Sequence, residues 1–531
     1  MNTRSSLRGW LSGAVVAALG FFSAPSFAQL THAQTSEGAL SGKTEGEVAA
    51  FLGVPFAAPP TGDDRWKPPR PAAKWEGERQ ADQFAASCQQ ALTPDGFGPW
   101  TREYVVQGRV SEDCLYLNVW TPAKTPAERL PVLFWIYGGG FTSGSGSVPI
   151  YDGAALAAKG IIVVNVNYRV GVYGFLAHPE LTAESPAHAS GNYGLLDQLA
   201  ALRWVRVNIA AFGGDPSRVT IAGQSAGAAS VHHLIASPLA AGLFARAIAE
   251  SGSGMGLRVP EHAEAEEVGQ NLSAADGKTL SLAALRALST QQLDARVAKM
   301  GGGSGPASLF GPVVDGSFLP NAQSVGKNDN DTPILTGMTA NETTGLSPAY
   351  GKTTVASFTA QVKDTYGAMA PDVQALYPAK DDDQAWTSLD ALARDRGLGA
   401  MYFWARERTS VSRHPIYAYL WTHPEPGPDA ERYGAFHSSE IPYVFGTLDT
   451  SQRPFEKADR ALADELSAYW VNFVKDGDPN GKRLTTWPKF TDEQKLIVEL
   501  GDRTRGRAVL APRQLEMFER YAKSGGSLSL F

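Results

Sequence analysis

Nearly continuous apolar runs alternate with helix-forming stretches through the middle of the chain. Runs of strand length lie at residues 115–120, 132–137, 161–168, 247–249, 332–335 and 415–421. Strands that are covered on both faces read in this way, without the alternation of a half-exposed sheet. Helical stretches follow at residues 151–159, 195–211 and 226–236. The pattern predicts an α/β fold with a large, mostly parallel central sheet.

Two polar-faced segments, residues 255–300 and 345–412, are predicted to be largely helical. A glycine-rich turn at 301–305 leads out of the first of them. Insertions of this kind in an α/β domain usually cover the carboxyl edge of the sheet and shape a pocket. Residues 29–60, with turns at Gly38 and Gly42, predict a small antiparallel start.

The first 28 residues have the pattern of a secretory signal. Arg4 and Arg8 precede an apolar stretch at 10–22, and small residues stand at Ser26 and Ala28. The apolar stretch is short for a membrane span. We expect cleavage after Ala28, a single mature domain over 29–531, and export to the periplasm or the medium.

Charge argues against nucleic acid as a partner. The formal net charge is −7, and removal of Arg4 and Arg8 without any acidic residue makes it −9. No block of basic residues is present to match a phosphate backbone. No later segment is apolar enough to predict a membrane partner, and the oligomeric state is left open.

Cys88 and Cys114 are the two cysteines of the chain. In an oxidising compartment we expect them to form a disulfide, which would stabilise the fold by roughly 3–4 kcal/mol in the entropic model. Two free thiols are the alternative. The further ligands that a metal site at these cysteines would need are not visible nearby, so no metal site is predicted here.

The pentapeptide Gly223-Gln224-Ser225-Ala226-Gly227 lies between a predicted strand and a predicted helix. A Gly-x-Ser-x-Gly run at such a junction is typical of a nucleophilic serine on a sharp, strained turn. A run of this kind can also occur in an ordinary loop, so the other residues of the site have to decide between the two interpretations. Ser225 is the candidate nucleophile.

Three glycines, Gly138 to Gly140, follow the predicted strand at 132–137. Glycine lets backbone N–H groups approach a developing oxyanion closely. The N–H of Ala226, at the start of the following helix, is a further candidate donor. A phosphate-binding loop is the rival interpretation, but the Gly-Lys-Ser/Thr sequence that such a loop requires is absent.

A serine nucleophile needs a histidine base and an acid that orients it. In folds that carry a Gly-x-Ser-x-Gly turn, the three residues follow the order serine, acid, histidine along the chain. The late histidines His414, His423 and His437 are therefore the candidates. Spacing favours His437 only modestly. Glu342 follows the strand at 332–335 and is the candidate acid.

At this point the sequence resembles the type B carboxylesterases, the family that includes bacterial para-nitrobenzyl-type esterases and cholinesterases. The motifs that carry the resemblance span nearly the whole mature chain and lie at residues 51–57, 111–118, 135–141, 167–169, 191–198, 212–216, 223–230, 250–252, 312–316, 337–342, 434–446, 477–480 and 487–488. The resemblance implies an α/β-hydrolase fold and hydrolysis of carboxylic esters without a cofactor.

Carried over residue by residue, the resemblance assigns roles to the site. It implies Ser225 as nucleophile, His437 as base and Glu342 as acid, with Ser251 helping to hold the acid. The implied oxyanion donors are Gly139, Gly140 and Ala226, and the implied disulfide is Cys88–Cys114. It also implies two structural ion pairs, Arg65 with Glu112 and Arg169 with Asp215.

The sequence departs from the family pattern at a few positions near the site, which are Gln224, Asn341, Thr343 and Ser438. None of these departures removes a catalytic atom. A secreted or periplasmic serine carboxylesterase is therefore the leading hypothesis. A catalytically silent binding protein and a serine peptidase of the same fold are the alternatives, and Phe141 and Phe310 are expected either to line the pocket or to belong to the core.

Overall fold

A computed structural model gives the arrangement of the chain and describes residues 1–2, 29–256, 258–275, 277–301, 309–321, 330–346 and 352–530. Residues 3–28 of the predicted signal segment and residues 302–305 of the glycine-rich turn lie outside the described residues. Within the described residues, no helix combines the length and the apolar character that crossing a bilayer requires.

A central sheet of eleven strands runs through the molecule. In spatial order the strands are β16 (Arg505–Ala508), β15 (Leu496–Leu500), β14 (Ile416–Trp421), β13 (Ile334–Thr339), β12 (Arg246–Glu250), β11 (Gly214–Gln224), β9 (Leu130–Ile136), β10 (Ile162–Val166), β8 (Tyr116–Thr121), β4 (Val48–Pro55) and β3 (Lys43–Glu45). Pairing is parallel from β10 through β15 and antiparallel at both ends of the sheet. The prediction of a mostly parallel sheet is confirmed.

The central strands form because their sequences suit a sheet with two covered faces. All five residues of β10 and all six of β13 and of β14 are buried. β-Branched and aromatic side chains dominate β10 and β14, and they pack well on a pleated surface. The parallel register then brings the ends of β9, β11, β12 and β13 to the same edge of the sheet.

Smaller strands lie outside the central sheet. Three of them form a separate sheet near the start of the described domain, β1 (His32–Gln34), β2 (Ala39–Ser41) and β5 (Glu78–Gln80), and two form a short pair, β6 (Ser87–Cys88) and β7 (Val110–Ser111). β1 and β2 are antiparallel, whereas β2 and β5 are parallel. The predicted antiparallel start is confirmed for β1 with β2 and for β3 with β4.

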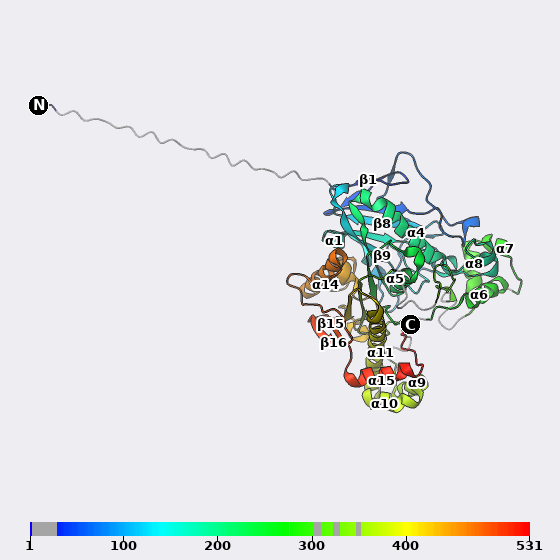
Figure 1. Cartoon of the computed structure of the whole chain (residues 1–531), viewed down its shortest axis with the longest axis vertical. Coiled ribbons are helices and arrows are strands. Elements are labelled where there is room, and N and C mark those ends of the chain that lie inside the picture. The colour runs from blue at the N-terminus through cyan, green and yellow to red at the C-terminus, as the bar shows by residue number, and fades with distance from the viewer. Residues whose placement is uncertain are drawn as a thin grey trace.

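Helices pack around the sheet and project beyond it on two sides (Figure 1). They are α1 (Ala154–Ala157), α2 (Gly171–Phe175), α3 (Pro179–Glu184), α4 (Tyr193–Asn208), α5 (Ala226–Ala236), α6 (His262–Ala274), α7 (Leu282–Arg286), α8 (Thr290–Ala298), α9 (Val355–Tyr366), α10 (Ala370–Leu376), α11 (Asp382–Val411), α12 (Ala430–Tyr433), α13 (Ile441–Phe445), α14 (Lys457–Asp476) and α15 (Pro512–Lys523). The helix predicted at 151–159 is shorter than expected, because a 3-10 turn at Pro149–Tyr151 precedes the four residues of α1.

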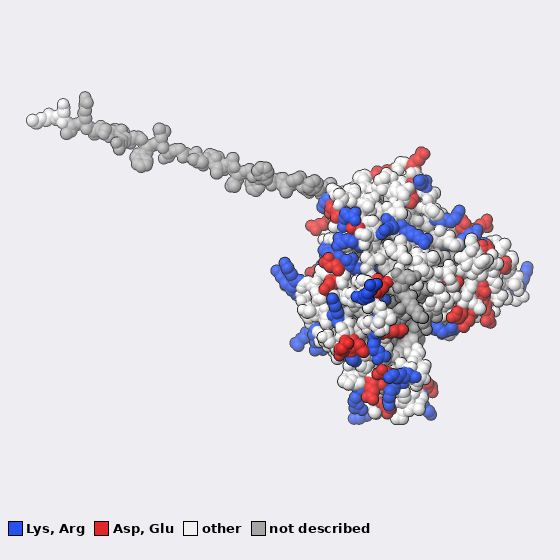
Figure 2. Space-filling view, viewed as in Figure 1, with Lys and Arg blue, Asp and Glu red and all other residues white. Residues whose placement is uncertain are grey.

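The two predicted helical insertions form separate groups. Helices α6, α7 and α8 gather at one side of the molecule, and α9, α10 and α15 pack together beneath α11 (Figure 1). Helix α11 begins where the Asp381 carboxylate accepts a hydrogen bond from the N–H of Gln384 at 2.8 Å, as an N-cap does. On the face shown in Figure 2, acidic and basic side chains are interspersed, with neither sign forming a large patch.

Candidate active site

Ser225 occupies a sharp turn between β11 and α5. Its backbone angles, φ 59° and ψ −124°, lie in a region that non-glycine residues rarely adopt and that costs about 1–3 kcal/mol. The neighbouring Gly227 makes the turn possible, because a Cβ atom there would lie 2.0 Å from the carbonyl oxygen of Ile136. The N–H of Ser225 donates to the carbonyl of Glu250 at 2.9 Å. The turn therefore holds Ser225 at the carboxyl edge of the sheet.

Unpaired backbone N–H groups flank Ser225. Gly139 has a φ of 107°, and its carbonyl oxygen accepts from the N–H of Thr142 at 3.0 Å and of Ser143 at 3.1 Å. Within the described residues, the N–H groups of Gly139, Gly140 and Ala226 have no acceptor. Unpaired amides at a strand end and at a helix N-terminus suit the binding of a negative oxygen.

Glu342 and His437 meet beside this turn. The Oε2 atom of Glu342 forms a hydrogen bond with Nδ1 of His437. The other carboxylate oxygen, Oε1, accepts from Ser251 Oγ at 2.6 Å and from the N–H of Thr339 at 2.8 Å. Both partners are buried, with 2% of Glu342 and 5% of His437 exposed. Two donors on Oε1 hold the carboxylate in one orientation, so Oε2 faces the ring.

The two other candidate histidines are placed elsewhere. His414 is exposed. His423 lies between two carboxylates, with Nε2 at 2.8 Å from Asp459 and Nδ1 at 2.6 Å from Asp502. Neither residue forms a hydrogen bond with Glu342. His423 instead connects the end of β14 with α14, through Asp459, and with the turn after β15, through Asp502.

Gln224 links the serine turn to the histidine. Its amide nitrogen lies 3.1 Å from Nε2 and 3.5 Å from Nδ1 of His437. A donor on the in-plane lone pair of Nε2 would be much further from Nδ1 than from Nε2. Nearly equal distances therefore place the amide over the face of the ring, outside the in-plane direction in which Nε2 accepts a proton.

Comparison with known proteins identifies the family of the chain. A model of the carboxylesterase family matches residues 29–518. The chain belongs to the carboxylesterase family. It is a hydrolase that acts on carboxylic esters, and its substrates are small-molecule esters.

Several curated carboxylesterase relatives match over most of their length. A fumonisin B1 esterase of Sphingopyxis macrogoltabida is 38% identical over 480 residues, which cover 87% of this chain and 85% of the relative. A para-nitrobenzyl esterase of Bacillus subtilis (strain 168) is 35% identical over 486 residues, covering 87% and 93%. A medium-chain fatty acyl-CoA hydrolase precursor of Anas platyrhynchos is 34% identical over 510 residues, covering 89% and 88%.

Residues that sequence reasoning missed hold two loops of this carboxylesterase together. One is the acid loop, which follows β13 and carries Glu342, and the other is the histidine loop, which follows α12 and carries His437. Asn341 accepts from the N–H of Ala435 at 2.9 Å through Oδ1 and donates to Asp390 at 2.7 Å through Nδ2. The Oγ1 of Thr344 donates to the carbonyl of Tyr433 at 2.8 Å. Asn341 had a signal, since it departs from the family pattern, but its partners are far away in the sequence.

Trp100 holds the histidine loop from the other side. Its indole Nε1 donates to the carbonyl oxygen of His437 at 3.0 Å. Trp100 lies between the two cysteines, and the Cys88–Cys114 disulfide is formed as predicted. The segment closed by the disulfide therefore contacts the catalytic histidine candidate directly.

Two further glutamates are buried near the site without being part of it. Glu250 and Glu440 are fully enclosed, with 0% of each exposed. Burial raises the pKa of both carboxyl groups well above the usual glutamate value. Trp470 Nε1 donates to Glu250 at 2.7 Å, and Tyr419 OH donates to Glu440 at 3.4 Å. Burial therefore favours the neutral form of both carboxyl groups.

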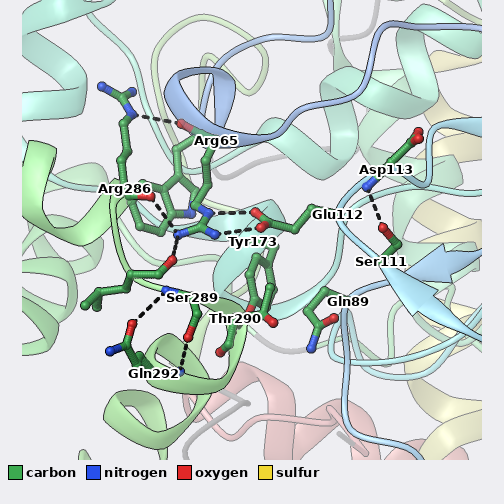
Figure 3. A network of polar contacts seen from close by, with 12 residues as sticks. Arg65, Gln89, Ser111, Glu112, Asp113, Tyr173, Arg286, Ser289, Thr290 and Gln292 are labelled. Carbon is green, nitrogen blue, oxygen red and sulfur yellow. Dashed lines mark hydrogen bonds and ion pairs between the residues drawn. The ribbon is translucent and has the colours of Figure 1, made fainter.

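One of the two predicted ion pairs is confirmed. Arg65 makes two hydrogen bonds of 2.6 Å to Glu112. Figure 3 shows the same guanidinium beside Arg286, whose backbone carbonyl accepts from it at 3.1 Å. The carbonyl of Leu288 also accepts from it, at 2.8 Å. Arg286 in turn donates to the carbonyl of Arg65 at 3.0 Å. This network anchors the end of α7 to the segment closed by the disulfide.

The second predicted pair is wrong. Arg169 pairs with Asp197 on α4, at 2.8 Å from Nε and 2.7 Å from Nη2. Asp215 instead pairs with Arg129 at 2.9 Å. Asp197 is fully buried and also accepts from the backbone N–H of Arg169 at 3.0 Å, so it binds that arginine from inside the core.

The two aromatic residues considered for the pocket differ. Phe310 is 2% exposed and belongs to the core. Phe141 is half-buried, follows Gly140 directly and packs edge-on against Phe175 at 5.3 Å between ring centres. Phe141 is therefore the aromatic residue that borders the site.

Proposed function

We propose that the chain hydrolyses carboxylic esters through an acyl-enzyme, with Ser225 as nucleophile, His437 as base and Glu342 as the acid that orients the base. The observation that carries this proposal is the pairing of His437 with Glu342 beside the strained turn that presents Ser225. Gln224, adjacent to Ser225 in the chain, touches the same imidazole ring at 3.1 Å. The three side chains therefore belong to one site.

The reaction follows from what each group can do. His437 takes the proton of the Ser225 hydroxyl as its oxygen attacks the ester carbonyl. The negative oxygen of the tetrahedral intermediate accepts hydrogen bonds from the N–H groups of Gly139, Gly140 and Ala226. The alcohol leaves with the proton from His437, and water activated by the same histidine then releases the acid.

The nucleophile is tested with Ser225→Ala. We expect kcat for a short 4-nitrophenyl ester to fall by several orders of magnitude while circular dichroism shows an unchanged fold. Ser524→Ala, at an exposed serine near the carboxyl terminus, is the matched control and should keep full activity. Retained activity in Ser225→Ala, or failure of a fluorophosphonate to label Ser225 in the unchanged chain, would contradict the assignment.

The base predicts the direction of the pH dependence. Activity should fall in acid, because a protonated imidazole can no longer accept a proton from the Ser225 hydroxyl. A rate of ester hydrolysis that stays level down to about pH 4 would exclude a histidine base.

We further propose that residues 1–28 are a signal removed on export, which leaves a mature domain over 29–531. The disulfide supports this proposal, because such bonds form and persist in oxidising compartments. Expression in a bacterial host, fractionation and amino-terminal sequencing test it. A chain that begins at Gln29 in the periplasm or medium is expected, and an uncleaved chain in the cytoplasm would contradict export.

A further inference from the structure

His233 is a buried histidine without a polar partner. It lies on α5, the helix that begins at the serine turn, and is 9% exposed. Neither ring nitrogen forms a hydrogen bond or an ion pair with the described part of the chain. Neither ring nitrogen is completely enclosed by the residues that the structure describes. Both ring nitrogens are therefore left unpaired by those residues, in a buried position, without being completely enclosed.

The preceding histidine shows what a structural role looks like on this helix. His232 Nε2 lies 2.8 Å from Ser253 Oγ, which lies 2.6 Å from Thr336 Oγ1. The ring of His232 also packs edge-on against Trp404 at 5.2 Å. His232 is thus satisfied by the protein, whereas its neighbour is not.

The position of His233 relates it to the oxyanion glycines. His233 and Ala226 are seven residues apart, close to two helical turns, and so share one face of α5. The ring centre of His233 lies 6.4 Å from that of Phe141, which follows Gly140 directly. Phe141, Phe175 and His233 therefore form one aromatic wall beside the proposed oxyanion site.

The charge state of His233 defines what it can bind. Burial lowers the pKa of His233 to about 4, so the ring is neutral at pH 7. A neutral imidazole offers one N–H donor and one acceptor nitrogen. An unsatisfied buried polar group is costly, and a ligand oxygen that accepts the N–H removes that cost.

We propose that His233 is a specificity residue that donates a hydrogen bond to an oxygen of the substrate other than the ester oxygens. The preferred substrates are then esters that carry a keto, ether or hydroxyl oxygen on the part of the molecule lying against Phe141. This inference rests on the proposed function, because it needs an ester held at Ser225. His233 thereby adds a hydrogen-bond donor for the substrate to a wall that otherwise consists of the rings of Phe141 and Phe175.

Matched ester pairs test the proposal and show which part of the ester contacts His233. The acyl pair is 4-nitrophenyl 4-oxopentanoate and 4-nitrophenyl pentanoate. The alcohol pair is 2-methoxyethyl acetate and butyl acetate. For each pair the ratio of kcat/KM, oxygen-bearing over plain, is measured in the unchanged chain and in His233→Phe, which keeps an aromatic ring and removes both nitrogens.

We expect His233→Phe to lower the ratio by about fivefold to tenfold for one of the two pairs, as loss of one neutral hydrogen bond would. Intrinsic reactivity cancels, because each ratio is compared between proteins for the same two esters. His414→Phe, at an exposed histidine, is the control and should leave both ratios unchanged. If His233→Phe does not fold, His233→Met decides by the same ratios.

Ratios within twofold of the unchanged chain for both pairs would overturn the role of His233 while leaving the proposed function intact. A different result, in which the unchanged chain hydrolyses none of the four esters and Ser225 is not labelled by a fluorophosphonate, would overturn the proposed function and this inference with it.

Discussion

The contact between Glu342 and His437 makes a sharp prediction for Glu342→Gln. The carboxylate oxygen Oε1 accepts from Ser251 Oγ at 2.6 Å and from the N–H of Thr339 at 2.8 Å. Because both are donors, the amide oxygen of the variant must take the place of Oε1. The amide NH₂ group then faces Nδ1 of His437, which has to accept a hydrogen bond instead of donating one.

The size of the effect follows from the change of tautomer. With Nδ1 as acceptor, the ring proton sits on Nε2, and the ring can no longer take a proton from Ser225. An acid-to-amide change in a serine hydrolase triad lowers kcat by about 10⁴-fold, which corresponds to about 5 kcal/mol in the barrier. Loss of a single hydrogen bond to a charged group would cost less, about 1.5–3 kcal/mol.

Steady-state hydrolysis of a 4-nitrophenyl ester measures this change, with circular dichroism as the check on folding. Glu440→Gln is a matched control, since Glu440 is equally buried and is not the hydrogen-bond partner of the His437 ring in the structure. It should lower kcat by less than about tenfold. A folded Glu342→Gln that keeps more than a tenth of the original kcat would refute the role of Glu342.

Three further changes test the surroundings of the site. Glu250→Gln should flatten the pH dependence of stability. In the unchanged chain, burial raises the pKa of Glu250 from the ordinary 4.5 to about 8, so the folded chain keeps a proton that the unfolded chain releases. The free energy of unfolding of the unchanged chain therefore falls as pH rises between these two values. Urea unfolding at several pH values should show the variant losing about 1.4 kcal/mol per pH unit less, and parallel slopes would contradict it. Arg65→Met should cost about 3–5 kcal/mol because it leaves the half-buried Glu112 and the carbonyl of Leu288 without the buried guanidinium, whereas Arg70→Met, at an exposed pair, should cost under about 1 kcal/mol in the same urea titration. Asn341→Leu should lower kcat about 10-fold to 100-fold by loosening the histidine loop from the acid loop, and unchanged kinetics would show that the contacts the variant keeps, such as the bond from the N–H of residue 341 to the carbonyl of Ala435 at 3.0 Å, are sufficient to hold the two loops.

The sequence was sufficient for the parts of this molecule that follow local rules. The buried strands β9 and β10 are readable because nearly every residue in them is apolar, and the turn at Ser225 is readable because only small residues fit around it. The place of Glu342 follows from its strand, since loops that leave parallel strands at one edge lie close together. These features depend on residues that are near each other in the chain.

The failures concern partners that only the packing of whole elements decides. The wrong partner for Arg169 arose because a charged residue can be recognised in a sequence while its partner cannot. Asp197 lies on a helix whose position is set by the sheet beneath it. The same holds for Trp100, whose indole reaches His437 across 337 positions of the chain. His233 gives no sequence signal at all, because its significance lies in a partner that the protein does not supply.

The side chains around the histidine differ in charge in a way that bears on catalysis. Gln224 is a neutral amide over the ring, and burial raises the pKa of both Glu250 and Glu440 well above the usual glutamate value. Glu342 differs from the other two glutamates because a hydroxyl and a backbone N–H both donate to it, as donors do to an ionised carboxylate. In the proposed reaction the imidazolium of His437 is therefore stabilised from one direction, along Nδ1, which would keep the ring oriented with Nε2 available to exchange a proton with substrate and serine. A glutamate in place of Gln224 would add a second negative charge over the ring face and weaken that directionality, which gives the neutral amide a physical role at this position.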